Sequence, residues 1–156
     1  MQNTIADPEG YKSVGLSEAY KLITPGLPVL VASRGRFYNL TPIAWNTPLD
    51  YEPVTKVLFV SDPTHQCALN IHRTQEFALC IPASADDPVI EQCGSVSCAD
   101  VDKFIKFGIP WIAAQKIDVH IQNGCSAWIE CHLTRVIKEG SVEIFLGESV
   151  AAFERT

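Results

Sequence analysis

Two polar, turn-rich segments contain the groups best suited to bind an anion. The first covers residues 39–47 and the second covers residues 61–66. A phosphate group needs several hydrogen-bond donors at once. These segments offer hydroxyl groups together with the free backbone N–H groups and positive dipole end of a predicted helix. The donors are the hydroxyls of Thr47, Ser61 and Thr64 and the first-turn residues His65 and Gln66. Taken singly, each of these residues also suits a structural role, such as a helix cap at Thr64.

The first segment also suits a flat aromatic ligand such as a flavin ring. Pro42 interrupts a predicted strand, and an irregular strand leaves backbone N–H groups free to bond to the polar edge of a ring. Trp45 and Trp111 could cover a face of the ring, although tryptophan is more often part of a core. We therefore expect a ring site near Pro42 and an anion site near residues 61–66.

Other catalytic arrangements are absent from the sequence. It contains no Gly-x-Ser-x-Gly nucleophile motif and no glycine-rich phosphate loop, and its four histidines show no metal-ligand spacing. We therefore predict no catalytic side chain and no metal site. A cofactor that carries its own chemistry needs only position and electronic tuning from the protein, so a cofactor-binding role agrees with this pattern.

The segments that must position these residues are mostly short strands. Apolar runs and alternating patterns predict strands over 28–33, 37–45, 54–60, 76–81, 127–137 and 142–153. Helices are predicted over 16–23, 64–73 and 100–107, with a helical turn within 86–91 and a loop over 46–53. Regular alternation of strands and helices is missing. We therefore predict a mainly β fold, a small Greek-key barrel or sandwich with helices packed outside.

The strand predicted over 54–60 separates the two polar segments. Its seven residues span roughly 23 Å, so the segments can converge only if residues 46–53 fold back along it. The first dozen residues are predicted to be a loose arm. The domain organisation expected is an arm with a short helix over 1–24 and a single domain over 25–156.

Composition limits the class of protein. A chain of 156 residues, 47% hydrophobic and 19% charged, suits one compact domain, and a net charge of −6 without a basic run argues against nucleic acid as a partner. No segment is apolar for long enough to span a membrane, and the N-terminus lacks the pattern of a signal peptide, so we expect a cytoplasmic protein. The six cysteines form no Cys-x-x-Cys pair and suit buried positions in a reducing compartment, although Cys93 or Cys98 could lie near a redox site.

Six blocks of sequence, in order, resemble the flavin reductase-like FMN-binding proteins, and among them the flavoredoxins most closely. The blocks are PVLVAS at 28–33, NLTPIAW at 39–45, EFALCIP at 76–82, CGSVS at 93–97, DVDKF at 100–104 and FLGESV at 145–150. The resemblance implies an FMN-binding split β-barrel that forms a homodimer with FMN between the subunits. It also implies electron transfer through the flavin, either as an NAD(P)H-dependent reductase or as a carrier that serves a redox protein.

By position, the resemblance carries over a set of cofactor-binding residues. Residues 39–47 would lie along the ring and the ribityl chain, while Ser61 and the turn 62–66 would approach the phosphate together with Thr47. Residues 95–103, from the same or the partner subunit, would complete the site. For Lys103, a solvated position on its helix is an equal alternative. The full set is Asn39, Thr41, Pro42, Ile43, Ala44, Trp45, Asn46, Thr47, Ser61, Asp62, Thr64, His65, Gln66, Ser95 and Lys103.

Three departures from the family pattern keep a second function open. Family members often have threonine where Cys67 stands and glycine where Cys98 stands. Many also continue past the position of Thr156 by a tail of a few dozen residues, so we expect a more open site or an altered substrate side. The alternative is a non-enzymatic split-barrel module that binds haem or another ligand, or that has lost its flavin site.

Overall fold

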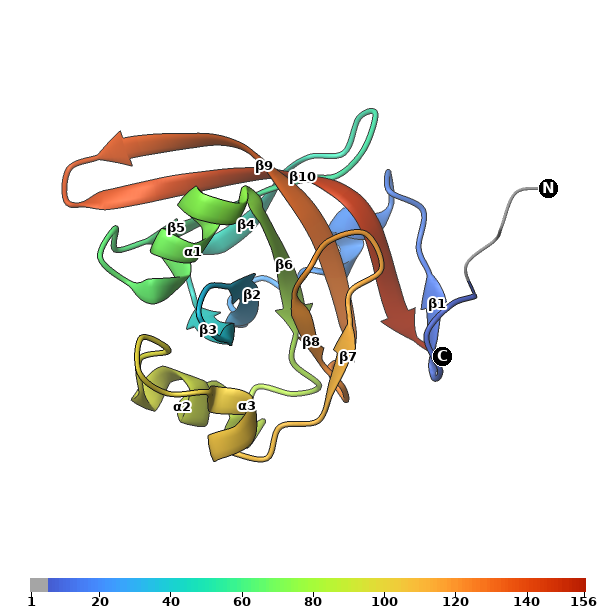
Figure 1. Cartoon of the computed structure of the whole chain (residues 1–156). Coiled ribbons are helices and arrows are strands. Elements are labelled where there is room, and N and C mark those ends of the chain that lie inside the picture. Colours follow the sequence, from blue (N-terminus) through green and yellow to red (C-terminus); the bar gives the residue numbers. More distant parts are fainter. Residues whose placement is uncertain (1–5) are drawn as a thin grey trace.

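A computed structural model describes residues 6–156 (Figure 1). Its strands are β1 (Tyr11–Ser13), β2 (Val29–Arg34), β3 (Tyr38–Ile43), β4 (Asn46–Asp50), β5 (Lys56–Ser61), β6 (Glu76–Ile81), β7 (Trp111–Ala113), β8 (His120–Gln122), β9 (Ala127–Glu139) and β10 (Val142–Arg155). Its α-helices are α1 (Gln66–Thr74), α2 (Pro88–Ser95) and α3 (Lys103–Lys106). The mainly β fold predicted from the sequence is confirmed. Across residues 6–156, no helix is long and apolar enough to cross a membrane.

One antiparallel sheet forms most of the fold, in the order β3-β2-β6-β9-β10-β5-β4, and β1 pairs with the end of β10. The two ends of this order, β3 and β4, are joined only by Ala44 and Trp45. Because so short a connection holds the outer strands together, the sheet must curl until its edges approach each other. The result is the split β-barrel that the sequence predicts.

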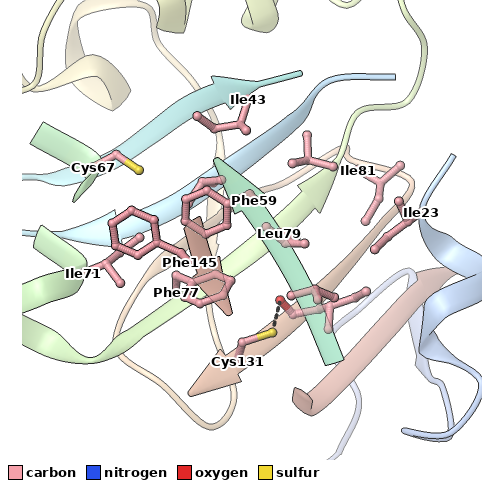
Figure 2. Close-up of a cluster of buried hydrophobic side chains, with 14 of the residues drawn as sticks. Ile23, Ile43, Phe59, Cys67, Ile71, Phe77, Leu79, Ile81, Cys131 and Phe145 are labelled. Atoms are coloured by element: carbon pink, nitrogen blue, oxygen red, sulfur yellow. Dashed lines mark hydrogen bonds between the residues drawn. The ribbon is translucent and has the colours of Figure 1, made fainter. Parts of the chain in front are cut away.

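Alternate residues of the strands fill the interior of the barrel (Figure 2). Three aromatic rings meet there: Phe59 and Phe145 are stacked with centroids 5.0 Å apart, and Phe77 meets Phe59 edge-on at 5.1 Å. Helix α1 adds Cys67 and Ile71 to the same cluster. The burial of this apolar surface is the main stabilising contribution to the fold.

A second buried cluster covers the opposite face of the sheet. Leu30 and Leu40 point to this side, and Trp128 packs there against Tyr11 with ring centroids 4.7 Å apart. Helices α2 and α3 and the hairpin β7–β8 contribute to this layer. Helices α1, α2 and α3 all contact β3, which therefore runs between the three helices (Figure 1).

The loop predicted over residues 46–53 is wrong in its first half, because Asn46–Asp50 forms β4 and pairs with β5. Asn46 lies opposite Phe59, and Pro48 lies opposite Val57. Pro48 concealed this strand, since proline is tolerated mainly at the edge of a sheet and β4 is the outermost strand. The segment does fold back along β5, which is the condition for the two polar segments to converge.

The N-terminal region differs from the predicted arm. Residues 1–5 lie outside the described part of the chain. Tyr11–Ser13 pairs with β10 as strand β1, and the Tyr11 hydroxyl donates to the main-chain oxygen of Cys125 at 2.8 Å. The helix predicted over 16–23 is reduced to a 3₁₀ helix over Ala19–Leu22. Strands β1, β7 and β8 were missed because three residues are too few to show an alternating pattern.

Helix α2 is longer than the turn predicted within 86–91. Asp87 caps it by accepting a hydrogen bond of 3.0 Å from the backbone N–H of Val89, and Pro88 occupies its first turn. Both features favour the start of a helix at this point. The helix runs from there to Ser95.

Helix α3 is shorter than the helix predicted over 100–107. The predicted capping pair, Ser97 and Asp100, does not form its N-terminus. Asp102 is the cap instead and accepts a hydrogen bond of 3.2 Å from the backbone N–H of Ile105. The helix therefore begins at Lys103, and only one turn precedes Phe107.

Candidate functional site

A pocket with a volume of about 760 Å³ lies where β3, the β5–α1 turn and the segment from α2 to α3 meet. Most of the predicted site residues line it. They are Asn39, Thr41, Pro42, Ile43, Ser61, Asp62, Thr64, His65, Gln66, Ser95 and Lys103. The two polar segments and residues 95–103 therefore come together within a single subunit. The size of the pocket falls in the range that holds a cofactor-sized ligand.

The start of α1 borders this pocket through His65 and Gln66. His65 is the N-cap, in an extended conformation and without a side-chain capping bond, so Thr64 is not the cap that the sequence suggested. The first bond of the helix runs from the N–H of Leu69 to the oxygen of His65, at 3.2 Å. The N–H groups of residues 66–68 thus lack acceptors within the helix and, with the helix dipole, favour an anion.

The turn before α1 is held by its own side chains. Asp62 accepts bonds from the hydroxyl of Thr64 at 2.7 Å and from its backbone N–H at 2.8 Å, and these bonds lower the pKa of Asp62. The hydroxyl of Ser61 donates to the main-chain oxygen of Asp62 at 3.1 Å. The hydroxyl protons of Ser61 and Thr64 are therefore engaged within the turn, and the backbone N–H groups of α1 are the free donors.

Asn39 presents an unpaired acceptor at the floor of the pocket. Its side chain is only 1% exposed, and its Nδ2 donates to the hydroxyl oxygen of Thr41 at 3.1 Å. Its Oδ1 has no hydrogen-bond partner in the described part of the chain. Buried polar atoms are nearly always paired, so this atom is suited to accept a donor from a bound ligand.

Lys103 is buried beside the same strand. It is 2% exposed, and its Nζ donates to the main-chain oxygen of Leu40 at 2.8 Å. The alternative of a solvated helix residue is therefore wrong. Burial lowers the pKa of Lys103, because an ammonium group loses hydration there. The pocket thus contains a partly desolvated cation.

Burial keeps the thiols of Cys93 and Cys98, which line the pocket, and of Cys67 on α1 protonated at neutral pH. Burial raises the pKa of Cys93 to about 11 and that of Cys67 to about 12, and it also raises the pKa of Cys98. The charge of Lys103 opposes these shifts only in part. Cys93 and Cys98 line the pocket, as a redox role would require, but neither is a thiolate nucleophile.

Pro42 packs against Gly94 at the side of the pocket. A Cβ at Gly94 would lie 3.1 Å from Cγ of Pro42, so a small residue is needed where α2 approaches β3. Sequence reasoning missed Val60, Leu69 and Gly94. Val96, Ser97, Cys98 and Ala99 fall within the range 95–103 that was expected to complete the site, and Cys93 was considered only for a redox role. Val60 and Leu69 looked like ordinary strand and helix positions.

Four predicted residues, Ala44 to Thr47, do not line this pocket. Trp45 is 70% exposed. The Nδ2 of Asn46 donates to the main-chain oxygen of Ile43 at 3.0 Å. The hydroxyl of Thr47 donates to the main-chain oxygen of Pro48 at 2.9 Å. Trp111 is also outside the pocket and stacks on His120, with ring centroids 3.6 Å apart. Within one subunit, these tryptophans therefore do not form the pocket wall.

Comparison with known proteins gives a consistent result. The family model of the flavin reductase like domain matches residues 22–156. The uncharacterized protein YddH of Escherichia coli (strain K12) is 29% identical over 144 residues, which cover 89% of this chain and 76% of that protein.

Two solved structures share the fold. The FMN-binding domain of a flavin reductases-like enzyme from Shewanella baltica OS155 has a TM-score of 0.81 and 28% identity, over 93% of this chain and 77% of that chain. A flavoredoxin from Methanosarcina acetivorans has a TM-score of 0.73 and 21% identity, over 83% of this chain and 69% of that chain, and it shows the common fold alone.

Proposed function

The chain belongs to the flavin reductase like domain family, and we propose on this premise that it binds FMN in the pocket beside β3 and transfers electrons through it. The observation that carries the proposal is the combination of groups in one pocket. A helix N-terminus and a buried ammonium suit an anion, and the unpaired Oδ1 of Asn39 suits a hydroxyl or N–H donor. FMN has a phosphate, a polyhydroxylated chain and a polar ring edge, which are the matching groups.

The lining residues can be matched to the successive parts of a bound FMN. The backbone N–H groups of residues 66–68 and the ammonium of Lys103 would hold the phosphate end. Residues 39–43 of β3 would lie along the ribityl chain and the ring, with Pro42 and Ile43 giving apolar contact. Ser95 and its neighbours would close the side opposite α1.

The flavin, when bound, supplies the redox chemistry by accepting a hydride and passing electrons on. The lining side chains contribute position and shielding from water. Their thiols are protonated, and the carboxylate of Asp62 accepts hydrogen bonds from Thr64. We propose NAD(P)H as the electron donor, with a second redox protein as the partner if the chain serves as a carrier.

We also propose that the chain forms a homodimer. Trp45 is 70% exposed, Leu49 and Tyr51 on the neighbouring edge are about half exposed, and Leu69 of the pocket lining is 50% exposed. A second copy that covers these side chains would bury apolar surface and bring residues 44–47 toward a cofactor. Six free cysteines support a reducing compartment, so we place the protein in the cytoplasm.

Oxidation of NADH and of NADPH, with and without added free flavin, tests the electron-transfer part. Turnover that needs free FMN or FAD indicates a reductase, whereas reduction of bound FMN without turnover of free flavin indicates a carrier. Light scattering tests the dimer, and a strict monomer would exclude a site shared between subunits.

The second candidate is a non-enzymatic ligand-binding module. It is favoured by Cys67, at a position where the family resemblance leads us to expect threonine, and by the engagement of the Thr64 hydroxyl with Asp62. Both features reduce the number of hydroxyl donors available to a phosphate. This candidate predicts no oxidation of NAD(P)H in the presence of FMN, and robust steady-state turnover excludes it.

A further inference from the structure

Cys80 and Cys125 are two buried thiols that meet between β6 and the turn leading from β8 into β9. Both are 0% exposed and belong to the second buried cluster. The backbone N–H of Ser126 donates to the main-chain oxygen of Ile81 at 2.8 Å, which holds the turn against the end of β6. The Cys80 thiol donates a hydrogen bond to the sulfur of Cys125. The two sulfur atoms are therefore neighbours, although the residues are far apart in the sequence.

A tight turn separates this pair of thiols from solvent. The N–H of Cys125 donates to the main-chain oxygen of Gln122 at 3.3 Å, and Asn123 between them is exposed. Gly124 has a φ of +114°, a conformation that favours glycine. Short surface turns open locally at much lower free energy than the sheet beneath them. A small oxidant can therefore reach the thiols without unfolding of β6 or β9.

The groups around Cys125 favour its thiolate form. Its sulfur accepts hydrogen bonds from the Cys80 thiol and from the backbone N–H of Ala127, and the Tyr11 hydroxyl lies 4.0 Å from it. Together with the charge of Arg155, these groups lower the pKa of Cys125 against the effect of its burial. The pKa of each of the other five cysteines is raised. A polarised sulfur beside a second thiol is the arrangement of a nucleophilic and a resolving cysteine.

We propose that Cys125 and Cys80 are a modification site, separate from the pocket beside β3, at which a peroxide produces a reversible disulfide. The sulfur of Cys125 attacks one oxygen of hydrogen peroxide. An S–O bond forms as the O–O bond breaks, and the thiol proton leaves with the released hydroxide as water. The sulfur of Cys80 then attacks that of Cys125, so that an S–S bond forms, the S–O bond breaks and a second water leaves.

The balance of this reaction is complete, since two thiols are oxidised to one disulfide while one hydrogen peroxide is reduced to two waters. In a reducing compartment, exchange with other thiols restores the reduced pair, as expected of a redox-sensing disulfide. The disulfide would join β6 to the turn before β9. The inference uses no property of a bound flavin and therefore goes beyond the proposed function.

The test is treatment of the reduced, folded chain with hydrogen peroxide, followed by alkylation of the remaining thiols, digestion and mass spectrometry. The wild type should lose two thiols per chain and give a pair of peptides linked through Cys80 and Cys125. The disulfide should raise the melting temperature by several degrees, and dithiothreitol should reverse the rise. Cys80→Ala should stop at a sulfenic acid on Cys125, which dimedone labels.

Two further variants test the role of the surroundings. Tyr11→Phe keeps the ring and removes the hydroxyl near the Cys125 sulfur, so disulfide formation should slow roughly fivefold, as expected for loss of one hydrogen bond. Cys131→Ala is the matched control, because it removes a fully buried thiol of β9 that belongs to the first cluster. This variant should form the disulfide at the rate of the wild type.

The map of the wild type decides the proposal even if a cysteine variant does not fold, which circular dichroism shows. A disulfide between any other pair of cysteines would overturn it. So would a wild type in which Cys80 and Cys125 both remain open to alkylation, or one that forms the bond only after urea is added. A chain that forms the bond and binds no flavin keeps this site and loses the proposed function, and the reverse result does the opposite.

Discussion

The ammonium of Lys103 donates a hydrogen bond of 2.8 Å to the main-chain oxygen of Leu40. This bond ties the one-turn helix α3 to β3 at the strand position between Asn39 and Thr41, which both line the pocket. A buried cation is thereby held against the strand that also has the unpaired amide oxygen of Asn39. The relationship explains why α3 can be so short, because its first residue is fixed by a contact outside the helix.

Asn39→Ala should weaken the binding of FMN and of riboflavin by the same factor, on the order of tenfold, because both flavins contain the ribityl hydroxyls that Oδ1 would accept. Fluorescence titration of the two flavins measures this. Asn123→Ala, at an exposed asparagine on the loop after β8, is the control and should change neither value. A loss confined to FMN would assign Asn39 to the phosphate instead.

Glu130→Gln should lower the free energy of unfolding by about 2–4 kcal/mol. Glu130 is fully buried and accepts bonds from the backbone N–H groups of Gln115 and Lys116, at 2.9 and 2.6 Å, and from Nε1 of Trp128 at 3.0 Å. An amide at this position turns an NH₂ group toward N–H donors. Chemical denaturation provides the measurement. Glu139→Gln, at the exposed end of β9, should be neutral, and an equal loss there would contradict this account.

Gly147→Ala should destabilise the fold by roughly 1–3 kcal/mol. An added Cβ would lie 2.4 Å from Cζ of Phe77 and 3.1 Å from Cβ of Cys131, so the aromatic cluster would have to shift. Gly15→Ala is the matched control, because a Cβ there meets nothing within 4 Å. The two melting temperatures should differ by several degrees. If both variants have the same melting temperature, the close packing at Gly147 does not determine the stability of the fold.

Stability should fall as pH rises above about 9. The pKa of Cys93 is raised by burial from 9.0 to about 11, so between these values the folded state keeps a proton that the unfolded chain has lost. The free energy of unfolding therefore decreases with pH in this window, by up to roughly 3 kcal/mol for this thiol. Cys67, with a pKa of about 12, acts in the same direction. The lowered pKa of Lys103 acts in the opposite direction. At pH values between its folded-state pKa and 10.5, the unfolded chain holds more protons at this amine than the folded state does, so this group makes stability rise with pH.

Urea denaturation at pH 7, 9 and 10.5 measures this decrease. Cys93→Ala should flatten the curve above pH 9 relative to the wild type, since alanine has no proton to lose. An unchanged slope in the variant would mean that Cys93 does not titrate in this range.

The sequence predicted the polar half of the site better than the apolar half. Pro42 and the turn at residues 61–66 have composition that is rare inside strands and helices, so they were identified directly. Val60 and Leu69 face the pocket from regular elements, and nothing in their own residue type distinguishes them from core positions. Only the register of β5 and the rotation of α1 decide which way they point.

The remaining differences have equally local causes. Glu130 alternates with Ile129 and Cys131 as a solvent-facing residue would, yet three N–H donors from Trp128 and the β7–β8 connection make it a buried acceptor. His132, on the same side of the alternating pattern, is exposed. The alternating pattern of a strand does not reveal partners that lie elsewhere in the sequence. Ser95 and Lys103 were reached through resemblance, because the pattern that predicted a helix over 100–107 does not show that Lys103 is buried, and the type of Ser95 does not mark it as a lining residue.

The absorption spectrum of the purified protein tests the central claim most directly. An FMN-binding protein should be yellow, or should become so after incubation with FMN and removal of the unbound flavin, and its visible flavin absorption should be lost on reduction. Denaturation should release FMN, identified by chromatography against riboflavin and FAD. A folded protein that is colourless and takes up no added FMN would contradict the account.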